Sequence, residues 1–189
     1  MKTIIKEKQW DQASVLFGVQ DEGRFGRINS PRKSWCLPKD RPQVAKQVVR
    51  QSVVADTFVC PEKAKATSLI LPYANTEMMN LFLEQVAKDF KESKIIMQVD
   101  QARWHQSKDL KIPENIVLIE QPPYSPELHP VEQIEAEVRE KFLDNQLFET
   151  LEDLKEQRAH GLKEIAEYGK RLTSLTNFPH LRNIIQKAN

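Results

Sequence analysis

Three acidic residues lie where the sequence pattern predicts the ends of secondary-structure elements. Asp21 follows the apolar segment ASVLFGVQ (13–20), Asp100 ends the hydrophobic segment KIIMQVD (94–100), and Glu132 opens a helical pattern. Short apolar runs with β-branched residues favour buried strands, so both aspartates are predicted at the C-terminal ends of strands. If these two strands are neighbours, the three carboxylates converge at one edge of a sheet.

Carboxylates packed this closely repel one another unless cations neutralise them. Hard oxygen ligands suit Mg²⁺ or Mn²⁺, and two such ions about 3.5–4 Å apart can clamp a phosphodiester. The residue types therefore predict a site for two divalent ions that acts on phosphoryl groups. The same pattern also fits unrelated surface acids at strand ends, and the spacing alone leaves both interpretations open.

The segment that delivers the glutamate, QPPYSPELHPVEQ (121–133), contains four prolines. Proline restricts φ and disfavours helix in the residue before it. Pro130 falls where a first-turn proline is tolerated, which makes His129 the predicted N-cap. A stiff loop loses little entropy on being ordered, so it can place Glu132 reproducibly.

The remaining pattern predicts a mixed α/β layer. Strands are predicted over 51–60, 66–72 and 115–121, and helices over 75–90, 131–146 and 150–172. Asn75 or Thr76 can cap the first helix. The glycines and proline of GRFGRINSPRKSWCLP (23–38) predict a second strand, a basic turn and a third short strand. Strands followed by helix–strand–helix alternation indicate a central sheet covered by helices.

Charge is almost balanced over the whole chain but is unevenly distributed. The 189 residues contain 28 Lys/Arg and 27 Asp/Glu, a net charge of +1. Residues 1–52 hold eleven basic and five acidic side chains, whereas 113–157 hold three and twelve. The basic N-terminal part can face an anion, although solvated charges are the plainer explanation.

Composition excludes several other classes. No apolar run approaches the about 20 residues that span a bilayer, and the N-terminus lacks a signal-peptide core. Cys36 and Cys60 are too few and too far apart for a disulfide scaffold or a zinc site, so free thiols in a reducing cytosol are expected.

Three blocks of this sequence together resemble the catalytic domain of a DDE transposase of the bacterial insertion-sequence branch of the Tc/mariner superfamily. They are LFGVQDEGRFGRI (16–28), IIMQVDQARWHQS (95–107) and IVLIEQPPYSPELHPVEQI (116–134). The third block is long and unusual in composition. The resemblance spans roughly 14–145 and implies an α/β, ribonuclease H-like fold with a mixed central sheet flanked by helices. We therefore expect a catalytic domain over 1–145 and a helical extension over 146–189 that packs on it.

By this resemblance, Asp21, Asp100 and Glu132 are the catalytic, metal-binding triad for Mg²⁺ or Mn²⁺, with two ions expected. The implied activity is DNA cleavage and strand transfer, with element ends and target DNA as partners and a homodimer formed on DNA. The chain reaches the first catalytic strand within about a dozen residues. The family's helix-turn-helix domain is therefore expected to be lost or separately encoded. The implied location is the bacterial cytoplasm, associated with the nucleoid.

Several other side chains are candidates for contact with DNA. Phosphate contacts are predicted for the basic region after Asp21, and further contacts for two residues of the second and third blocks; these residues are Arg24, Arg27, Arg32, Lys33, His105 and Tyr124. Solvated turn charges, a structural histidine and a tyrosine that locks its loop are the alternatives. Glu22 ranks below Asp21 as a ligand because adjacent strand residues point to opposite faces.

Three residues beside the triad depart from the family pattern. Gln101 replaces an asparagine, His129 replaces an asparagine, and Glu135 replaces a tryptophan. An inactive remnant that binds DNA or pairs with another subunit is therefore an alternative, as is another ribonuclease H-like nuclease such as a junction resolvase. The Pro-Pro-Tyr-Ser-Pro block favours the transposase over the resolvase.

Overall fold

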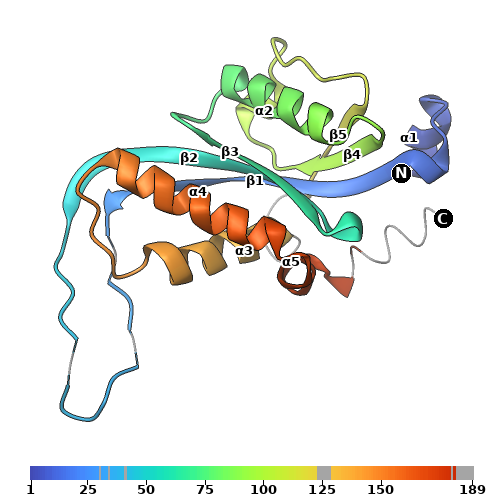
Figure 1. Ribbon diagram of the computed structural model, residues 1–189. Coiled ribbons are helices and arrows are strands. Elements are labelled where there is room, and N and C mark those ends of the chain that lie inside the picture. The colour runs from blue at the N-terminus through green and yellow to red at the C-terminus, as the bar shows by residue number, and fades with distance from the viewer. Residues whose placement is uncertain (30, 34, 41, 123–128, 180, 182–189) are drawn as a thin grey trace.

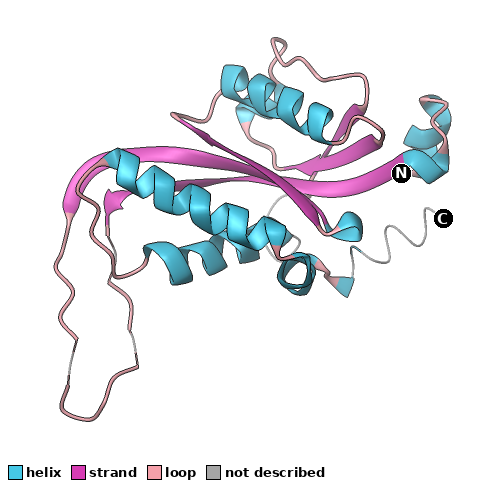
Figure 2. Ribbon diagram, viewed as in Figure 1, coloured by secondary structure: helices cyan, strands magenta, loops and turns pink. Residues whose placement is uncertain are grey.

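β1 is the central strand of a five-stranded mixed sheet with the order β3-β2-β1-β4-β5. The computed structural model describes residues 1–29, 31–33, 35–40, 42–122, 129–179 and 181. β1 pairs antiparallel with β2 and parallel with β4, β2 pairs antiparallel with β3, and β4 pairs parallel with β5 (Figure 2). The strands are β1 Val15–Ile28, β2 Val48–Cys60, β3 Lys65–Leu71, β4 Lys94–Val99 and β5 Ile116–Glu120.

Helices cover both faces of this sheet (Figure 1). α2 (Thr76–Asp89) lies on one face, and α3 (Pro130–Val138), α4 (Leu151–Glu167) and α5 (Gly169–Thr176) lie on the other. A short α1 (Lys2–Glu7) precedes β1. Single helical turns complete the described elements: 3-10 turns at Gln12–Ser14, Pro61–Lys63 and Arg103–Gln106, and a π-helical turn at Arg139–Leu143.

Side-chain alternation along β1 divides the core into two clusters. Leu16 belongs to the cluster under α2, whereas Phe17, Val19 and Phe25 belong to the cluster under α3, α4 and α5. All four side chains are buried. A strand covered on both faces reads as a continuous apolar run, which is the pattern of residues 13–20.

Most predicted elements are confirmed. The strands over 51–60, 66–72, 94–100 and 115–121 and the helix over 75–90 are present within a few residues of their predicted ends. Asn75 caps α2 by accepting a hydrogen bond from the Met78 backbone N–H at 2.9 Å. Cys36 and Cys60 are free thiols, as expected.

The region after Asp21 differs from the prediction. β1 does not end there but continues to Ile28, and no third strand lies between Asn29 and Gln47 in the part of the chain that the structure describes. The glycines that suggested a turn lie inside β1, where neighbours come too close for a side chain. A Cβ at Gly23 would collide with the Glu135 carboxylate, and one at Gly26 would lie 2.5 Å from the Gln51 carbonyl oxygen.

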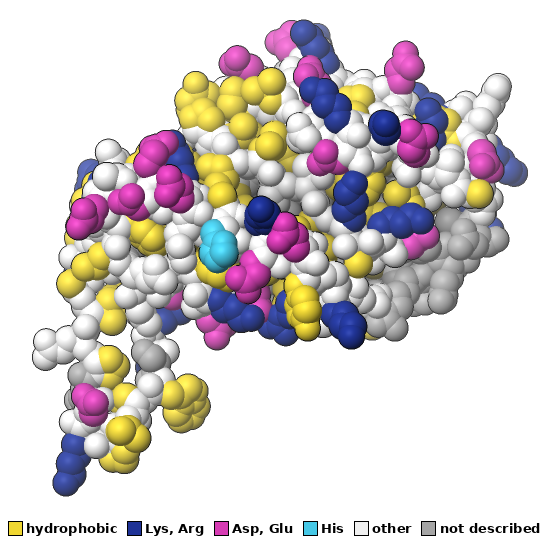
Figure 3. All heavy atoms as spheres, viewed as in Figure 1, with side chains coloured by type: hydrophobic (Ala, Val, Ile, Leu, Met, Phe, Trp, Pro, Cys, Tyr) yellow, Lys and Arg dark blue, Asp and Glu magenta, His cyan; other side chains and the backbone are white. Residues whose placement is uncertain are grey.

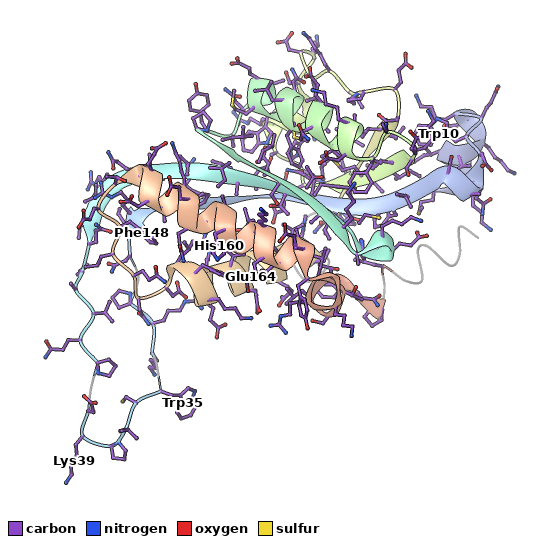
Figure 4. The ribbon with its side chains drawn as sticks, in the orientation of Figure 1. Trp10, Trp35, Lys39, Phe148, His160 and Glu164 are labelled. Atoms are coloured by element: carbon purple, nitrogen blue, oxygen red, sulfur yellow. The ribbon has the colours of Figure 1, made fainter. Side chains whose placement is uncertain are left out.

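The segment between β1 and β2 leaves the body of the molecule as a long loop (Figure 1). Trp35 and Lys39 lie at its far end, and Phe148 lies where it joins the body (Figure 4). Hydrophobic side chains gather on this projection (Figure 3). Among them, Trp35 is fully exposed and Leu37 is 74% exposed.

Two ion pairs fix α3 against its neighbouring helices. Glu135 pairs with Arg158 of α4, which is fully buried and lies 5.0 Å from the centre of the Phe25 ring. Glu137 accepts two hydrogen bonds from Arg171 of α5, at 2.8 and 2.6 Å. The remaining glutamate of α3, Glu132, is exposed and has no ion-pair partner among the described residues. Glu135, which stands where the family pattern has a tryptophan, is therefore paired with a charged residue of α4.

Candidate active site

The parallel pairing of β1 and β4 brings two of the predicted acids to the same level of the sheet. Val19 aligns with Gln98 in this register. Extending the alignment by two positions places Asp21 beside Asp100, which is the first residue after β4. The condition for convergence, that these two strands are neighbours, is met. The prediction that Asp21 ends its strand is wrong, because β1 continues to Ile28.

The third acid approaches from α3. His129 is the N-cap and Pro130 the first helical residue, as predicted, which leaves Glu132 in the first turn. Val131 and Ile134 pack into the core cluster that contains Val19 and Phe25, so the start of α3 lies over β1 near Asp21. Residues 123–128 of the proline-rich loop, including Tyr124, lie outside the described residues.

The pKa of Asp21 shows that the three carboxylates influence one another. This pKa is raised to about 7, mainly by burial and in addition by the negative charges of Glu22, Asp100 and Glu132. One backbone hydrogen bond, from the Glu22 N–H at 2.9 Å, opposes the shift. Burial is therefore the main cause of the shift, and the neighbouring acids add to it.

His105 links β1 to the end of β4 through the side chains of Glu22 and Asp100. Its Nδ1 lies 2.9 Å from Asp100 Oδ1, and its Nε2 lies 3.0 Å from Glu22 Oε1. Although burial alone would lower the pKa of His105, these hydrogen bonds raise it to about 10. The same contact with His105 holds the pKa of Asp100 below its usual range, so Asp100 is ionised at neutral pH.

Glu22 is an anchor in this arrangement. Besides His105, its Oε1 accepts a hydrogen bond from the Trp104 indole N–H at 2.8 Å. Trp104 and His105 lie in the 3-10 turn directly after Asp100, so Glu22 ties that turn to β1. The sequence indicated that Glu22 faces away from Asp21. It gave no direct sign of a partner, because the partners lie 82 and 83 residues along the chain.

Glu22, Asp100 and His105 have ligand atoms within 4.8 Å of one another, which is close enough for a metal ion. Both ring nitrogens of His105 are, however, already at hydrogen-bonding distance from carboxylate oxygens. A histidine that donates from both nitrogens has no lone pair left for a metal. We therefore interpret this group as a bridge that orients Asp100.

Asp100 and Glu132 also offer carboxylate oxygens that solvent can reach. The Asp100 side chain is 47% exposed, and Glu132 is exposed. An all-carboxylate donor set suits a hard divalent cation such as Mg²⁺ or Mn²⁺. The raised pKa of Asp21 fits this chemistry as well, because a bound cation would stabilise the ionised form of this carboxyl group.

The predicted basic side chains have different environments. Arg27 is used within the structure, since it donates to the Phe148 carbonyl at 3.0 Å, to Gln51 at 2.7 Å and to the Glu149 carbonyl. Arg32 pairs with Asp144 at 2.9 Å. Arg24 and Lys33 are exposed. His105, with a side chain that is 1% exposed, offers no surface to DNA.

Comparison with known proteins agrees with this architecture. The sequence profile described as DDE superfamily endonuclease matches residues 15–155, and the chain belongs to this family. The uncharacterised protein y4pE/y4sA of Sinorhizobium fredii is 39% identical over 97 residues, which cover 51% of this chain and 72% of that protein.

Three solved structures of Mos1 are also similar, each at 14% identity over 94% of this chain. They are a strand transfer complex (TM-score 0.55), a mariner paired-end complex with Mn (0.56) and a pre-cleavage transpososome (0.56). The chain spans 59–60% of the length of those Mos1 chains. The similarity confirms the expected ribonuclease H-like fold. Over the described residues, no helix is both long and apolar enough to cross a membrane.

Asp56 is a buried acid beside this site that the sequence did not single out. It is 2% exposed, lies opposite Glu22 in the β1–β2 pairing, and its Oδ1 has no hydrogen-bond partner among the described residues. Its pKa is raised to about 8, mainly by burial and in addition by the charges of Glu22 and Asp21, while the charge of His105 opposes the shift.

We predict that Asp56→Asn stabilises the protein by an amount that grows with pH. The unfolded chain loses the Asp56 proton near pH 4, whereas the folded chain keeps it up to about pH 8, so wild-type stability falls over this interval. The amide cannot ionise and should gain at least about 1 kcal/mol at pH 7, or about 2–4 °C in Tm. Melting curves from pH 5 to 8 test this.

The exposed Asp40 provides a control. Asp40→Asn should leave the pH dependence of Tm unchanged. Parallel curves for wild type and Asp56→Asn across the whole pH range would show that Asp56 carries no such penalty.

Proposed function

We propose that this chain is the catalytic domain of a DNA transposase that performs divalent-metal-dependent cleavage and strand transfer, with Asp21, Asp100 and Glu132 as its catalytic acids. The observation that carries the proposal is the convergence of these acids from β1, the end of β4 and the start of α3. The raised pKa of Asp21, to which burial contributes most and the charges of Asp100 and Glu132 contribute less, supports the proposal. Membership of the DDE endonuclease family supports it.

The chemistry consists of two phosphoryl transfers. In cleavage, a water oxygen bonds to the scissile phosphorus, the bond from phosphorus to the 3′-oxygen breaks, and that oxygen takes a proton and leaves as a hydroxyl. In joining, this 3′-hydroxyl attacks a target phosphorus, and the target's own 3′-oxygen leaves with the proton. Each step exchanges one phosphoester bond with water or with another phosphoester, so no redox partner is needed.

The side chains of this chain have separate tasks in the proposed site. Asp21, Asp100 and Glu132 would hold two Mg²⁺ or Mn²⁺ ions. When bound, these ions activate the attacking oxygen and stabilise the leaving oxygen. His105 keeps Asp100 ionised and fixes its orientation through Glu22. The ion pairs of Glu135 and Glu137 hold α3 so that Glu132 faces the cluster.

The natural partner is DNA, both the element ends and the target. The Mos1 structures are described as paired-end and strand transfer complexes, and by analogy we propose that this chain acts on DNA ends. We expect it to act there as a homodimer. A separately encoded helix-turn-helix domain would supply recognition of the ends, and the bacterial nucleoid would be the site of action.

We expect Asp100→Asn to abolish strand transfer without unfolding the protein. The neutral amide removes one of the charges that bind the cations, while Asn preserves the shape and still accepts a hydrogen bond from the Ala102 N–H. Pre-cut duplex ends incubated with supercoiled plasmid and Mn²⁺ provide the assay. Asp109→Asn, at an exposed position of the following loop, is the matched control and should remain active.

Joined product from Asp100→Asn at the wild-type level would refute the proposed site. If neither wild type nor Asp109→Asn forms product even when a DNA-binding domain is added in trans, the chain is the inactive remnant instead.

His105→Ala should lower the strand-transfer rate by about 10–100-fold, the usual cost of losing a group that orients a metal ligand. The Mn²⁺ concentration for half-maximal rate should rise, while the KM for DNA should not change, because the buried ring does not reach the substrate. His105→Gln, which retains one donor, should recover part of the rate. A change in the KM for DNA alone would point to a direct contact with the substrate.

A further inference from the structure

A hollow of about 540 Å³ lies where the long loop joins the body of the molecule. Its walls are the distal parts of β1 and β2, the π-helical turn after α3, and the segment that leads to Phe148. Figure 4 shows Phe148 at this junction. None of the catalytic acids lines the hollow.

Four arginines line this hollow, which we call the arginine hollow: Arg24, Arg32, Arg50 and Arg139. One carboxylate, Asp144, is the only acidic group among the lining residues, and it pairs with Arg32 at 2.9 Å. Among the described residues that line the hollow, no further acidic side chain accompanies the other three arginines. Positive charge gathered in a hollow of this kind favours the binding of an anion.

Amide side chains build the walls of the hollow. Asn29 accepts from the Gln47 N–H at 2.8 Å and donates to the Ala45 carbonyl at 2.9 Å, which closes the base of the loop. Gln47 exchanges hydrogen bonds with the Phe148 backbone, and Asn145 does the same with the backbone of Arg32. These contacts fix the shape of the hollow.

The arginines, in contrast, keep donors available. Arg24 and Arg50 are exposed, and neither side chain has a hydrogen-bond partner among the described residues. Arg139 donates from one nitrogen to the Arg24 carbonyl and has further N–H groups to offer. Guanidinium forks match the paired oxygens of a phosphate.

The hollow lies at a defined spacing from the acid cluster. Arg24 follows Asp21 by three residues along β1, which corresponds to about 10 Å at the rise of a strand. Arg139 follows Glu132 by seven residues, again about 10 Å at the rise of a helix. Both elements thus lead from the acids to the arginines over the same distance. In duplex DNA this distance covers about three nucleotides of one strand at 3.4 Å each.

We propose that the arginine hollow binds a backbone phosphate of the DNA strand that reacts at Asp21, Asp100 and Glu132, about three nucleotides from the reacting phosphodiester. The inference rests on the proposed function and adds a second contact to it. Its role is to fix the position of the strand, since a phosphate contact carries no base information. An acidic peptide is a weaker candidate, because nothing ties its position to the acid cluster.

The first test measures DNA binding by fluorescence anisotropy, with the full chain, a labelled duplex of arbitrary sequence and Ca²⁺ in place of Mg²⁺. Between about 50 and 200 mM KCl, the slope of log K against log salt should fall by about 0.9 when one phosphate contact is lost. Arg24→Gln/Arg50→Gln should show this loss. Lys88→Gln/Lys91→Gln removes the same charge near the end of α2, on the other face of the sheet, and should retain the wild-type slope.

The second test locates the contact. A single neutral methylphosphonate is placed at successive linkages from the 3′-hydroxyl of a pre-cut duplex. Wild type should lose affinity when the substitution lies near the third linkage, whereas Arg24→Gln/Arg50→Gln should be insensitive to it. Equal sensitivity of both proteins at every linkage would overturn the proposal.

Binding does not require chemistry, so these results are separate from the strand-transfer assay. A protein that lacks transfer activity but shows the arginine-dependent slope would keep the hollow as a phosphate site and refute only the catalytic proposal. If the arginine variant keeps the wild-type salt slope, or if its self-association changes while its DNA binding does not, the hollow binds something other than DNA.

Discussion

The parallel pairing of β1 with β4 is the constraint on which the site depends, because it sets two carboxylates side by side inside a folded domain. Such an arrangement is unfavourable unless the remaining structure holds it in place. His105 does so on one side by joining Asp100 to Glu22. On the other side, α3 brings Glu132 over the strand. The free energy that holds these charges together comes from the apolar clusters on both faces of β1.

The glutamates of α3 have different roles. Glu135 and Glu137 are neutralised by Arg158 of α4 and Arg171 of α5, which leaves Glu132 as the glutamate of that helix available to the site. A buried ion pair contributes little net stability, but removal of one partner costs several kcal/mol. The pair between Glu135 and Arg158 therefore secures the position of α3 more than it stabilises the fold. The close approach of Gly23 to Glu135 adds a steric condition to the same contact.

Much of this architecture could be predicted from the sequence because it rests on local signals. The apolar runs, the Asn75 cap and the proline before Glu132 identified most strands, one helix start and the N-cap of α3. The continuation of β1 through Gly23 and Gly26 could not be predicted. Glycine is required at these positions by close contacts with α3 and β2, which are distant in sequence. The anchoring role of Glu22, the burial of Asp56 and the pairing of Arg158 were hidden for the same reason. Each depends on a contact between segments that are distant in sequence and that only the fold brings together.

We propose that Asp21, Asp100 and Glu132 form a binding site for divalent cations. Titration with Mn²⁺, with free Mn²⁺ followed by electron paramagnetic resonance, measures this directly in wild type, Asp21→Asn, Glu132→Gln and Glu22→Gln. We expect wild type to bind Mn²⁺, and we expect the affinity to fall by about tenfold or more in Asp21→Asn and in Glu132→Gln. Equal affinity in wild type, Asp21→Asn and Glu132→Gln, or binding that is lost only in Glu22→Gln, would show that the metal binds elsewhere.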